Sequence, residues 1–215
     1  MVSTRLPGKI LELIAGRPLL DHVLYRLRNL RHPVRIVVAT GDAPHNDPVA
    51  VFCAERSVDC FRGSEQDVLA RYYECARQCS FDQVVRLTGD NPFIDVEELN
   101  RLIDFHLVGG HEFSSSLGEL PLGVGAEIFT FAALERCALK GQAPHHREHV
   151  DEYILENPTL FRCGHLAVPE YKRHPELRLT VDTPEDLRRA RFIAEHATES
   201  HVTTEEAIDL CLRFA

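Results

Sequence analysis

Short apolar runs alternate with helical segments through the first half of the chain. Residues 35–40 and 83–88 are short, mainly apolar runs, and each is followed by a glycine. Runs of this kind are typical of parallel strands that are buried on both faces. Leucine and valine recur at helical spacing over residues 18–30, ahead of the first run. The alternation predicts a doubly wound α/β sheet, in which a helix joins each strand to the next.

Further elements follow from the same periodicity. The first half also predicts a strand over residues 58–61 and helices over residues 47–55, 66–79 and 95–107. Glycine and proline interrupt residues 113–131, which indicates strands and loops of a cap or edge region. The remaining predictions are a helix over 147–156, a strand over 177–181, a helix over 186–196 with Thr183 as N-cap, and a final helix opened by a capping box of Thr203 and Glu206.

The composition indicates one globular domain over residues 1–215. Apolar residues make up 44% of the chain and charged residues 27%, which is ordinary for a soluble protein with a full core. The formal net charge of −9 argues against a nucleic-acid surface, because affinity for a phosphate backbone requires a basic field. Seven cysteines, an odd number, indicate reduced thiols, and no apolar run has membrane length. We therefore expect a cytoplasmic protein that binds neither nucleic acid nor a membrane.

Residues 3–9 combine two cations with a turn at the start of the chain. Arg5 presents a planar fork of donors and Lys9 a point charge, and both suit phosphate oxygens. Gly8 follows Pro7 and lets the backbone approach a ligand closely. A helix-like apolar run comes next, and its free N–H groups would add to an anion site. On these residues alone, a phosphate-binding loop and an ordinary basic loop are equally open.

Two aspartates stand close after the ends of predicted strands. Asp90 follows the run at 83–88, and Asp182 follows the run at 177–181. Ligands collect at the carboxyl ends of strands in open α/β sheets. Each aspartate alone is also compatible with a turn or an N-cap. Together with Arg5 and Lys9, the two acids favour a metal–phosphate site, because Mg²⁺ prefers one or two carboxylates plus substrate phosphates.

Two further polar clusters lead into predicted helices. The first is a loop whose residues either hold a base or ribose or cap the helix: Arg62, Gly63, Ser64, Asp67 and Arg71. The second contains Arg147, with His145 and His149 at the spacing of a zinc pair but without an evident third ligand. For this second cluster, the alternative is a polar surface turn with one useful arginine.

Six segments in order make the chain similar to a known family. They are residues 3–9, 38–40, 61–73, 86–92, 147–150 and 179–186. The chain resembles the nucleotide-sugar cytidylyltransferases, in the branch of spore coat polysaccharide biosynthesis protein F, with CMP-Kdo and CMP-sialic acid synthetases as relatives. The resemblance implies a Rossmann-like nucleotide-diphospho-sugar transferase fold (GT-A-like), with a mostly parallel sheet flanked by helices.

The resemblance also implies a reaction and roles for individual residues. CTP and a sugar or sugar acid would give a CMP-sugar and pyrophosphate, in surface polysaccharide or glycoconjugate synthesis. Arg5, Lys9 and Asp90 would act on the triphosphate, and Asp90 with Asp182 would hold Mg²⁺. The implied substrate-binding residues are Gly8, Arg62, Gly63, Ser64, Asp67, Arg71, Glu127 and Arg147. A homodimer is compatible with this interpretation.

Two departures from the family pattern accompany the resemblance. Family members usually have a central strand that ends in Gln-Ala-Arg just before the position of Met1, so we expect the first strand to be missing from this sequence and encoded upstream. Around Gly123, the family often carries acids where Leu122 and Gly125 stand here, whereas Glu127 remains.

These departures keep two other functions open. The first is a truncated, non-catalytic relative that acts as a binding protein. The second is a glycosyltransferase of similar fold, although neither Asp90 nor Asp182 belongs to an Asp-x-Asp pair. Release of pyrophosphate from CTP would distinguish a cytidylyltransferase from both of these alternatives.

Overall fold

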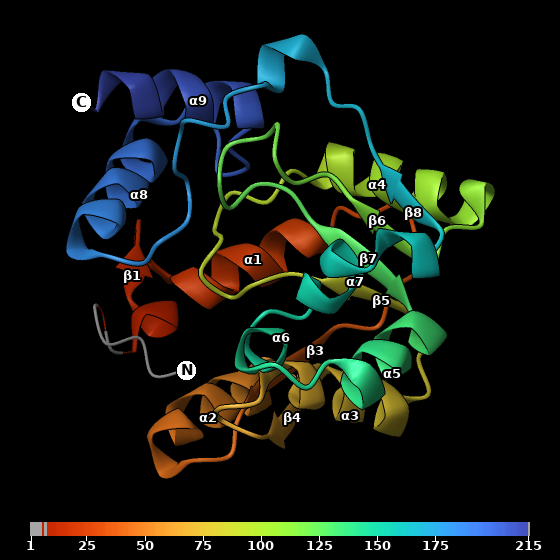
Figure 1. The fold of residues 1–215 in the computed structure, drawn as a ribbon. Coiled ribbons are helices and arrows are strands. Elements are labelled where there is room, and N and C mark those ends of the chain that lie inside the picture. Colours follow the sequence, from red (N-terminus) through yellow and green to blue (C-terminus); the bar gives the residue numbers. More distant parts are fainter. Residues whose placement is uncertain (1–5, 7, 215) are drawn as a thin grey trace.

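The predicted alternation of strands and helices is present in the first half of the chain. The computed structural model describes Leu6 and residues 8–214 (Figure 1). The elements of this half are α1 (Leu19–Leu27), β3 (Val37–Gly41), α2 (Asp47–Glu55), β4 (Asp59–Gly63), α3 (Val68–Cys79), β5 (Gln83–Arg86) and α4 (Val96–Gly109). A short hairpin of β1 (Leu13–Ile14) and β2 (Arg17–Pro18) precedes them.

The second half completes the sheet and adds helices around it. Its strands are β6 (Phe113–Ser115), β7 (Glu127–Thr130) and β8 (Cys163–His165). Its helices are α5 (Phe131–Lys140), α6 (Pro144–Glu148), α7 (Glu152–Glu156), α8 (Pro184–His196) and α9 (Thr204–Arg213). Short 3₁₀ turns occur at η1 (Lys9–Leu11), η2 (Pro44–Asn46), η3 (Pro158–Leu160) and η4 (Glu170–Lys172).

Apart from the β1–β2 hairpin, the described strands form two sheets. In one, β3 and β4 pair in parallel, from Val37 opposite Asp59 to Gly41 opposite Gly63. The other has the order β5-β7-β6-β8, in which β6 and β8 are parallel and β7 is antiparallel to both of its neighbours. The α/β class with helices around a central sheet is therefore confirmed.

Side-chain caps begin the longer helices where the sequence places them. The Thr183 hydroxyl accepts the Asp186 N–H at the start of α8, and Asp186 accepts the Thr183 N–H in return. At α9, Thr203 accepts the Glu206 N–H, but the Glu206 carboxylate accepts the Thr198 N–H at 2.7 Å instead of closing the box. The reciprocal box is therefore correct for α8, whereas α9 has only its N-cap half.

Three predicted elements differ from the structure. The helix expected over 147–156 is two short helices, because His149 takes an extended conformation between α6 and α7. Residues 177–181 form no strand in the described part of the chain: only an isolated bridge joins Arg178 to Leu122. The run after Gly8 is a single 3₁₀ turn, which offers fewer aligned N–H groups than the expected helix.

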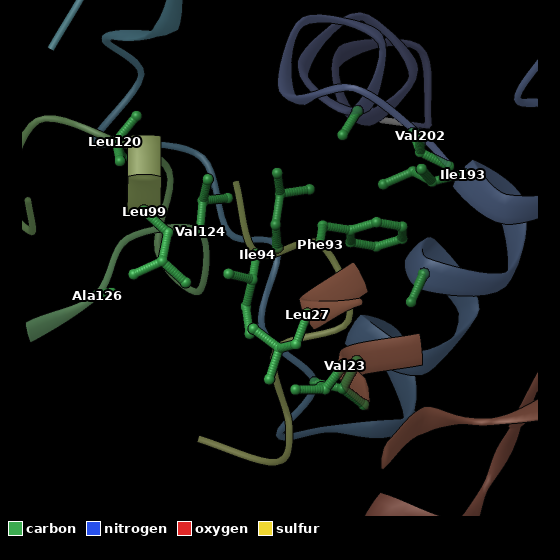
Figure 2. Packing of buried hydrophobic residues seen from close by; sticks show 14 of the residues in the cluster. Val23, Leu27, Phe93, Ile94, Leu99, Leu120, Val124, Ala126, Ile193 and Val202 are labelled. Carbon is green, nitrogen blue, oxygen red and sulfur yellow. The ribbon is translucent and has the colours of Figure 1, made fainter. Parts of the chain in front are cut away.

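The largest apolar cluster fixes the loop that follows β5. Figure 2 shows Phe93 and Ile94 of this loop among buried side chains that include Leu27 of α1 and Ile193 of α8. Phe93 and Ile94 are 3% and 0% exposed, and burial of each such side chain contributes about 1.5–3 kcal/mol. The loop is therefore anchored a few residues after Asp90. None of the described helices is both long and apolar enough to span a bilayer.

Candidate active site

The Lys9 ammonium lies between two carboxylates that are far apart in the sequence. Its Nζ donates to Asp90 Oδ2 and to Asp182 Oδ1, each at 2.6 Å. The Lys9 side chain is 12% exposed, against 23% for Asp90 and 30% for Asp182. The structure thus brings together three residues that the sequence assigned to one metal–phosphate site.

Backbone contacts hold the two aspartates beside each other. The Val181 N–H donates to the Asp90 carbonyl at 2.9 Å, which ties the loop after β5 to the segment that enters α8. Lys9 begins η1 directly after Gly8, whose φ of 69° lies in the left-handed region that glycine adopts without strain. The local backbone structure therefore fixes the position of each of the three charged residues.

A second layer of charges surrounds Asp182. Arg178 forms ion pairs with Asp182 and with the buried Asp186. Burial acts to raise the pKa of Asp186, but the N–H groups of Asp182 and Thr183 and the Thr183 hydroxyl outweigh burial, so that pKa lies below its usual range. Asp186 is therefore held as an anion that orients Arg178 and the backbone of Asp182.

The chemistry of this donor set fits a hard divalent cation. Asp90 and Asp182 offer carboxylate oxygens to the same point, where the structure places a positive charge. Next to Asp90, the buried Asn91 Oδ1 accepts no hydrogen bond within the described residues. Mg²⁺ binds through one or two carboxylates and completes its shell with water and phosphate oxygens. The residues present are thus compatible with Mg²⁺ in place of the Lys9 ammonium.

Another group of potential ligands lies on α6 and α7. His145 Nε2 and His146 Nε2 each lie 2.7 Å from an oxygen of Glu156. The Ala143 N–H donates to His146 Nδ1 at 3.2 Å, so the bonding assigns the ring proton to His146 Nε2. A protonated Nε2 donates to Glu156 and cannot ligate a metal. His149, the expected zinc partner of His145, is not part of this group.

The loop after β4 is tied to α6 through one ion pair. Asp67 caps α3 by accepting the Ala70 N–H at 2.8 Å, and its other oxygen accepts Arg147 Nε at 2.8 Å. Ser64 accepts the Asp67 N–H at 3.0 Å, and Arg71 donates to the Ser64 carbonyl at 2.5 Å. Three residues expected around a nucleoside, together with Arg147 of the other polar cluster, therefore form one connected network.

The other two residues expected in this loop lie at its start. Arg62 donates to the carbonyls of Asp42 and Ala43, each at 3.0 Å, and forms an ion pair with Asp47 at 2.6 Å. Gly63 ends β4, and a Cβ there would lie 2.7 Å from the Phe61 ring. Arg62 thus joins β4 to the start of α2, and Gly63 leaves room for the ring.

Glu127 lies in a buried cluster rather than on the surface. Its side chain forms an ion pair with Arg86, and its residue is 1% exposed. Burial raises the pKa of Glu127 to about 8, against the opposing effect of the Arg86 charge. Glu127 Oε1 and Arg86 Nε have no hydrogen-bond partner among the described residues. The carboxyl of Asp151 also raises the pKa of Glu127, so the cluster contains two acids and one arginine rather than an isolated pair.

Tyr72 connects the buried cluster to the other groups. Its hydroxyl donates to the Leu87 carbonyl at 2.9 Å. Burial raises the pKa of Tyr72, and the charges that act on it come from Arg86, Arg71, Glu127 and Asp90. Charges of the nucleoside-side network, the buried pair and the lysine site therefore all act on this one phenol, whose hydroxyl bonds just after the end of β5.

Several of these residues were not among the expected site residues. Arg86 is the one charge in the mainly apolar run at 83–88, and this contrast could have indicated its role. Arg178 stands four residues before Asp182, a spacing that carries no such signal because the segment is neither helix nor strand. Arg5 lies outside the described residues.

Comparison with known proteins gives consistent matches over the whole chain. A family model described as "Cytidylyltransferase" matches residues 1–211. A curated relative, the spore coat polysaccharide biosynthesis protein SpsF of Bacillus subtilis, is 34% identical over 99% of this chain and 91% of its own length. A 3-deoxy-manno-octulosonate cytidylyltransferase of Marinobacter nauticus is 39% identical over 47% of this chain and 39% of its own.

The solved structures include a protein of closely similar fold. The structure of a cytidylyltransferase from Leptospira borgpetersenii superimposes with a TM-score of 0.90 at 30% identity, and covers 99% of this chain and 90% of its own. The family model, the match to SpsF and this fold match extend over the segments that carry Lys9, Asp90 and Asp182.

Proposed function

The chain belongs to the cytidylyltransferase family, and from this premise we propose that it transfers CMP from CTP to a sugar or sugar acid. An acceptor oxygen forms a bond to the α-phosphorus, the bond to the β-phosphate breaks, and pyrophosphate leaves. The observation that carries the proposal is the convergence of Lys9, Asp90 and Asp182 at 2.6 Å. A phosphoryl-type transfer of this kind depends on positioning and charge neutralisation, which such a site provides.

In this proposal the residues of the lysine site have complementary roles. Asp90 and Asp182 would hold Mg²⁺, which offsets charge on the triphosphate and on the departing pyrophosphate. With the two acids holding the metal, Lys9 would donate to the phosphate oxygens instead of to the carboxylates. Its position on a one-turn helix after Gly8 suits this change, since only the lysine side chain has to move.

The nucleoside would lie toward the network of Ser64, Asp67, Arg71 and Arg147. Asp67 and Arg147 are 29% and 25% exposed, so they are accessible to a ligand while their mutual bonds fix their positions. The acceptor would lie toward the segment that precedes Glu127. Relatives named for 3-deoxy-manno-octulosonate and for spore coat polysaccharide support a sugar or sugar acid, and hence glycoconjugate synthesis.

We place this reaction in the cytoplasm, where thiols remain reduced. All seven cysteines are free in the structure, and Cys53, Cys75, Cys137 and Cys211 are buried.

A direct test combines four nucleoside triphosphates with a panel of acceptors. The panel contains 3-deoxy-manno-octulosonate, sialic acid and neutral sugars, with Mg²⁺ present, and the readouts are pyrophosphate and the nucleotide-sugar. The proposal expects both products from CTP with at least one acceptor. A clear preference for UTP, GTP or ATP would move the protein to another nucleotidyltransferase activity. Transfer from a supplied nucleotide-sugar without pyrophosphate would contradict the proposal in favour of a glycosyltransferase.

A further inference from the structure

The Arg178 guanidinium binds two carboxylates on the segment that enters α8. Its Nη2 donates to Asp182 Oδ2, and its Nε lies 3.2 Å from Asp186 Oδ1 and 3.3 Å from Asp186 Oδ2. Asp186 is only 4% exposed, so this end of the guanidinium is anchored to a buried acid. Asp182 is one of the two acids that would hold Mg²⁺. Arg178 therefore acts directly on a candidate metal ligand.

Backbone contacts fix the position of Arg178 as well. On one side of it the Leu122 N–H donates to the Leu177 carbonyl at 2.9 Å, and on the other the Leu179 N–H donates to the Leu122 carbonyl at 2.8 Å. The Arg178 carbonyl accepts Arg189 Nη1 at 3.2 Å. The guanidinium is thus a planar donor whose backbone and Nε are both held in place.

The two oxygens of Asp182 have different partners. Oδ2 accepts Arg178 Nη2, whereas Oδ1 accepts the Lys9 ammonium at 2.6 Å. Lys9 reaches this point on a flexible four-carbon side chain from a one-turn helix, so its ammonium can be displaced by a cation. Arg178 stays in place when that exchange occurs. Asp182 then offers one oxygen to the incoming cation, and its second oxygen remains bonded to the guanidinium.

Divalent cations differ in how they use a carboxylate. Mg²⁺ requires near-ideal octahedral geometry at about 2.0–2.1 Å and combines one or two carboxylates with several waters. Ca²⁺ takes roughly six to eight oxygens at about 2.3–2.6 Å in flexible geometry, and carboxylates bind it through one oxygen or through both. A donor that occupies one carboxylate oxygen excludes binding through both oxygens and still allows binding through one.

We propose that Arg178 is a positioning residue that favours Mg²⁺ over Ca²⁺, because it keeps Asp182 Oδ2 from binding the metal. The inference rests on the metal ligands of the proposed function, but it concerns binding of the ion alone and not the transfer of CMP. The Arg178 charge also repels both ions, which carry the same charge. The ratio of the two affinities removes this common effect and reports the geometry.

The test measures metal binding to the full chain without nucleotide. Mn²⁺ is the probe, its paramagnetic resonance signal reports the unbound ion, and Mg²⁺ and Ca²⁺ are titrated as competitors. Arg178→Met should raise the affinity for Ca²⁺ relative to Mg²⁺ by at least about tenfold, within the range found when partners of metal ligands are removed. Arg178→Lys keeps the charge beside Asp186 but lacks the planar fork, so its ratio should shift in the same direction.

Arg189→Met is the matched control. Arg189 Nη1 donates to Asp186 Oδ1 at 2.9 Å, so this substitution removes the same charge and a bond to the same buried acid. No bond joins Arg189 to Asp182 among the described residues, and the ratio of the native chain should therefore be retained. The same shift in Arg189→Met and in Arg178→Met would overturn the proposal, because the effect would then come from Asp186.

Two further outcomes separate this inference from the proposed function. Equal changes in the affinities for Mg²⁺ and Ca²⁺ in Arg178→Met, with Mn²⁺ binding weakened in Asp182→Asn, would contradict the inference alone, because the guanidinium would act only through its charge. Mn²⁺ binding that is unchanged in Asp182→Asn would show that Asp182 holds no metal. That result would contradict both the inference and the metal site on which it rests.

Discussion

Two charged regions of the molecule differ in how easily their side chains can exchange one partner for another. Lys9, Asp90 and Asp182 are between 12% and 30% exposed and come from loops and a one-turn helix. Arg86 and Glu127 face each other on the paired strands β5 and β7, and their side chains are 18% and 2% exposed. The first group can exchange its partners with a ligand, whereas the second is held by the sheet.

The difference indicates which charged side chains can bind a ligand and which stabilise the fold. An ammonium between two accessible carboxylates can be replaced by a metal ion without loss of hydrogen bonds, because solvent and phosphate can satisfy each group. A buried pair has no such replacement, and removal of one partner leaves the other without its hydrogen bond in an apolar region. We therefore expect substitutions in the first region to affect catalysis and those in the second to affect stability and its pH dependence.

The largest effect is expected for Asp90→Asn and Asp182→Asn. Each substitution removes a charged oxygen ligand, and a metal ion contributes several kcal/mol to such a transition state, so pyrophosphate release should fall by about 100- to 1000-fold. The unfolding midpoint should change little, because both side chains are partly exposed. Steady-state rates with CTP and the best acceptor give the comparison.

Asp104→Asn provides a matched control for these variants. Asp104 is 55% exposed on α4 and pairs with Arg31 at 3.5 Å, so its loss removes the same charge from the surface. Its rate should equal that of the native chain. A comparable fall in all three variants would mean that net charge, rather than the lysine site, determines the rate.

The second prediction concerns Lys9→Met. Loss of the ammonium should weaken CTP binding by about 10- to 100-fold, because a charged hydrogen bond to phosphate contributes roughly 1.5–3 kcal/mol. The same variant should bind Mg²⁺ alone more tightly than the native chain does, since no ammonium competes for Asp90 and Asp182. Calorimetric titrations with each ligand measure both effects. Weaker Mg²⁺ binding would show that Lys9 does not occupy the position of a cation.

The third prediction is a pH dependence of stability from the buried pair. Burial raises the pKa of Glu127 from 4.5 to about 8, so between these values the folded state holds a proton that the unfolded chain releases. Stability from this group is therefore present below pH 4.5 and is lost as the pH rises toward 8. Urea unfolding of Glu127→Gln should lack this component. Parallel pH profiles of the native chain and the variant would contradict the assignment.

The smallest effect is expected for Arg147→Met. It removes the ion pair with Asp67 and the bonds to the carbonyls of Ala138 and Gly141, and should lower the unfolding free energy by about 1 kcal/mol. Arg77→Met is the control, because Arg77 forms an exposed ion pair with Glu74 on α3. A larger loss for Arg77 than for Arg147 would show that the pair with Asp67 contributes nothing.

Local signals in the sequence were sufficient for most helices and for part of the site. Helix α2 has the predicted bounds because Pro48 marks its first turn. The meeting of Lys9, Asp90 and Asp182 was predicted from two acids after strand-like runs, although only the run before Asp90 is a strand in the structure. The break at His149 could not be anticipated. The helical periodicity of residues 147–156 continues through His149, whereas its backbone is extended and ends α6.

Other features depend on contacts that the sequence does not encode locally. Residues 177–181 have the composition of a strand, but their backbone groups bond to Leu122 and Asp90 in loops. The pairing of Glu127 with Arg86 follows from the register of β5 and β7, which joins residues 41 positions apart. Such partners become visible only once the strand order is known.

The central claim is that Asp90 and Asp182 couple a divalent metal to nucleotide binding, and calorimetry of CTP tests it most directly. CTP is titrated into the native chain with Mg²⁺, into the same protein with a chelator, and into Asp90→Asn with Mg²⁺. We expect the affinity to fall by at least about tenfold in the second and third titrations, within the usual range of coupling between two ligands. Equal affinity in all three titrations would contradict the claim.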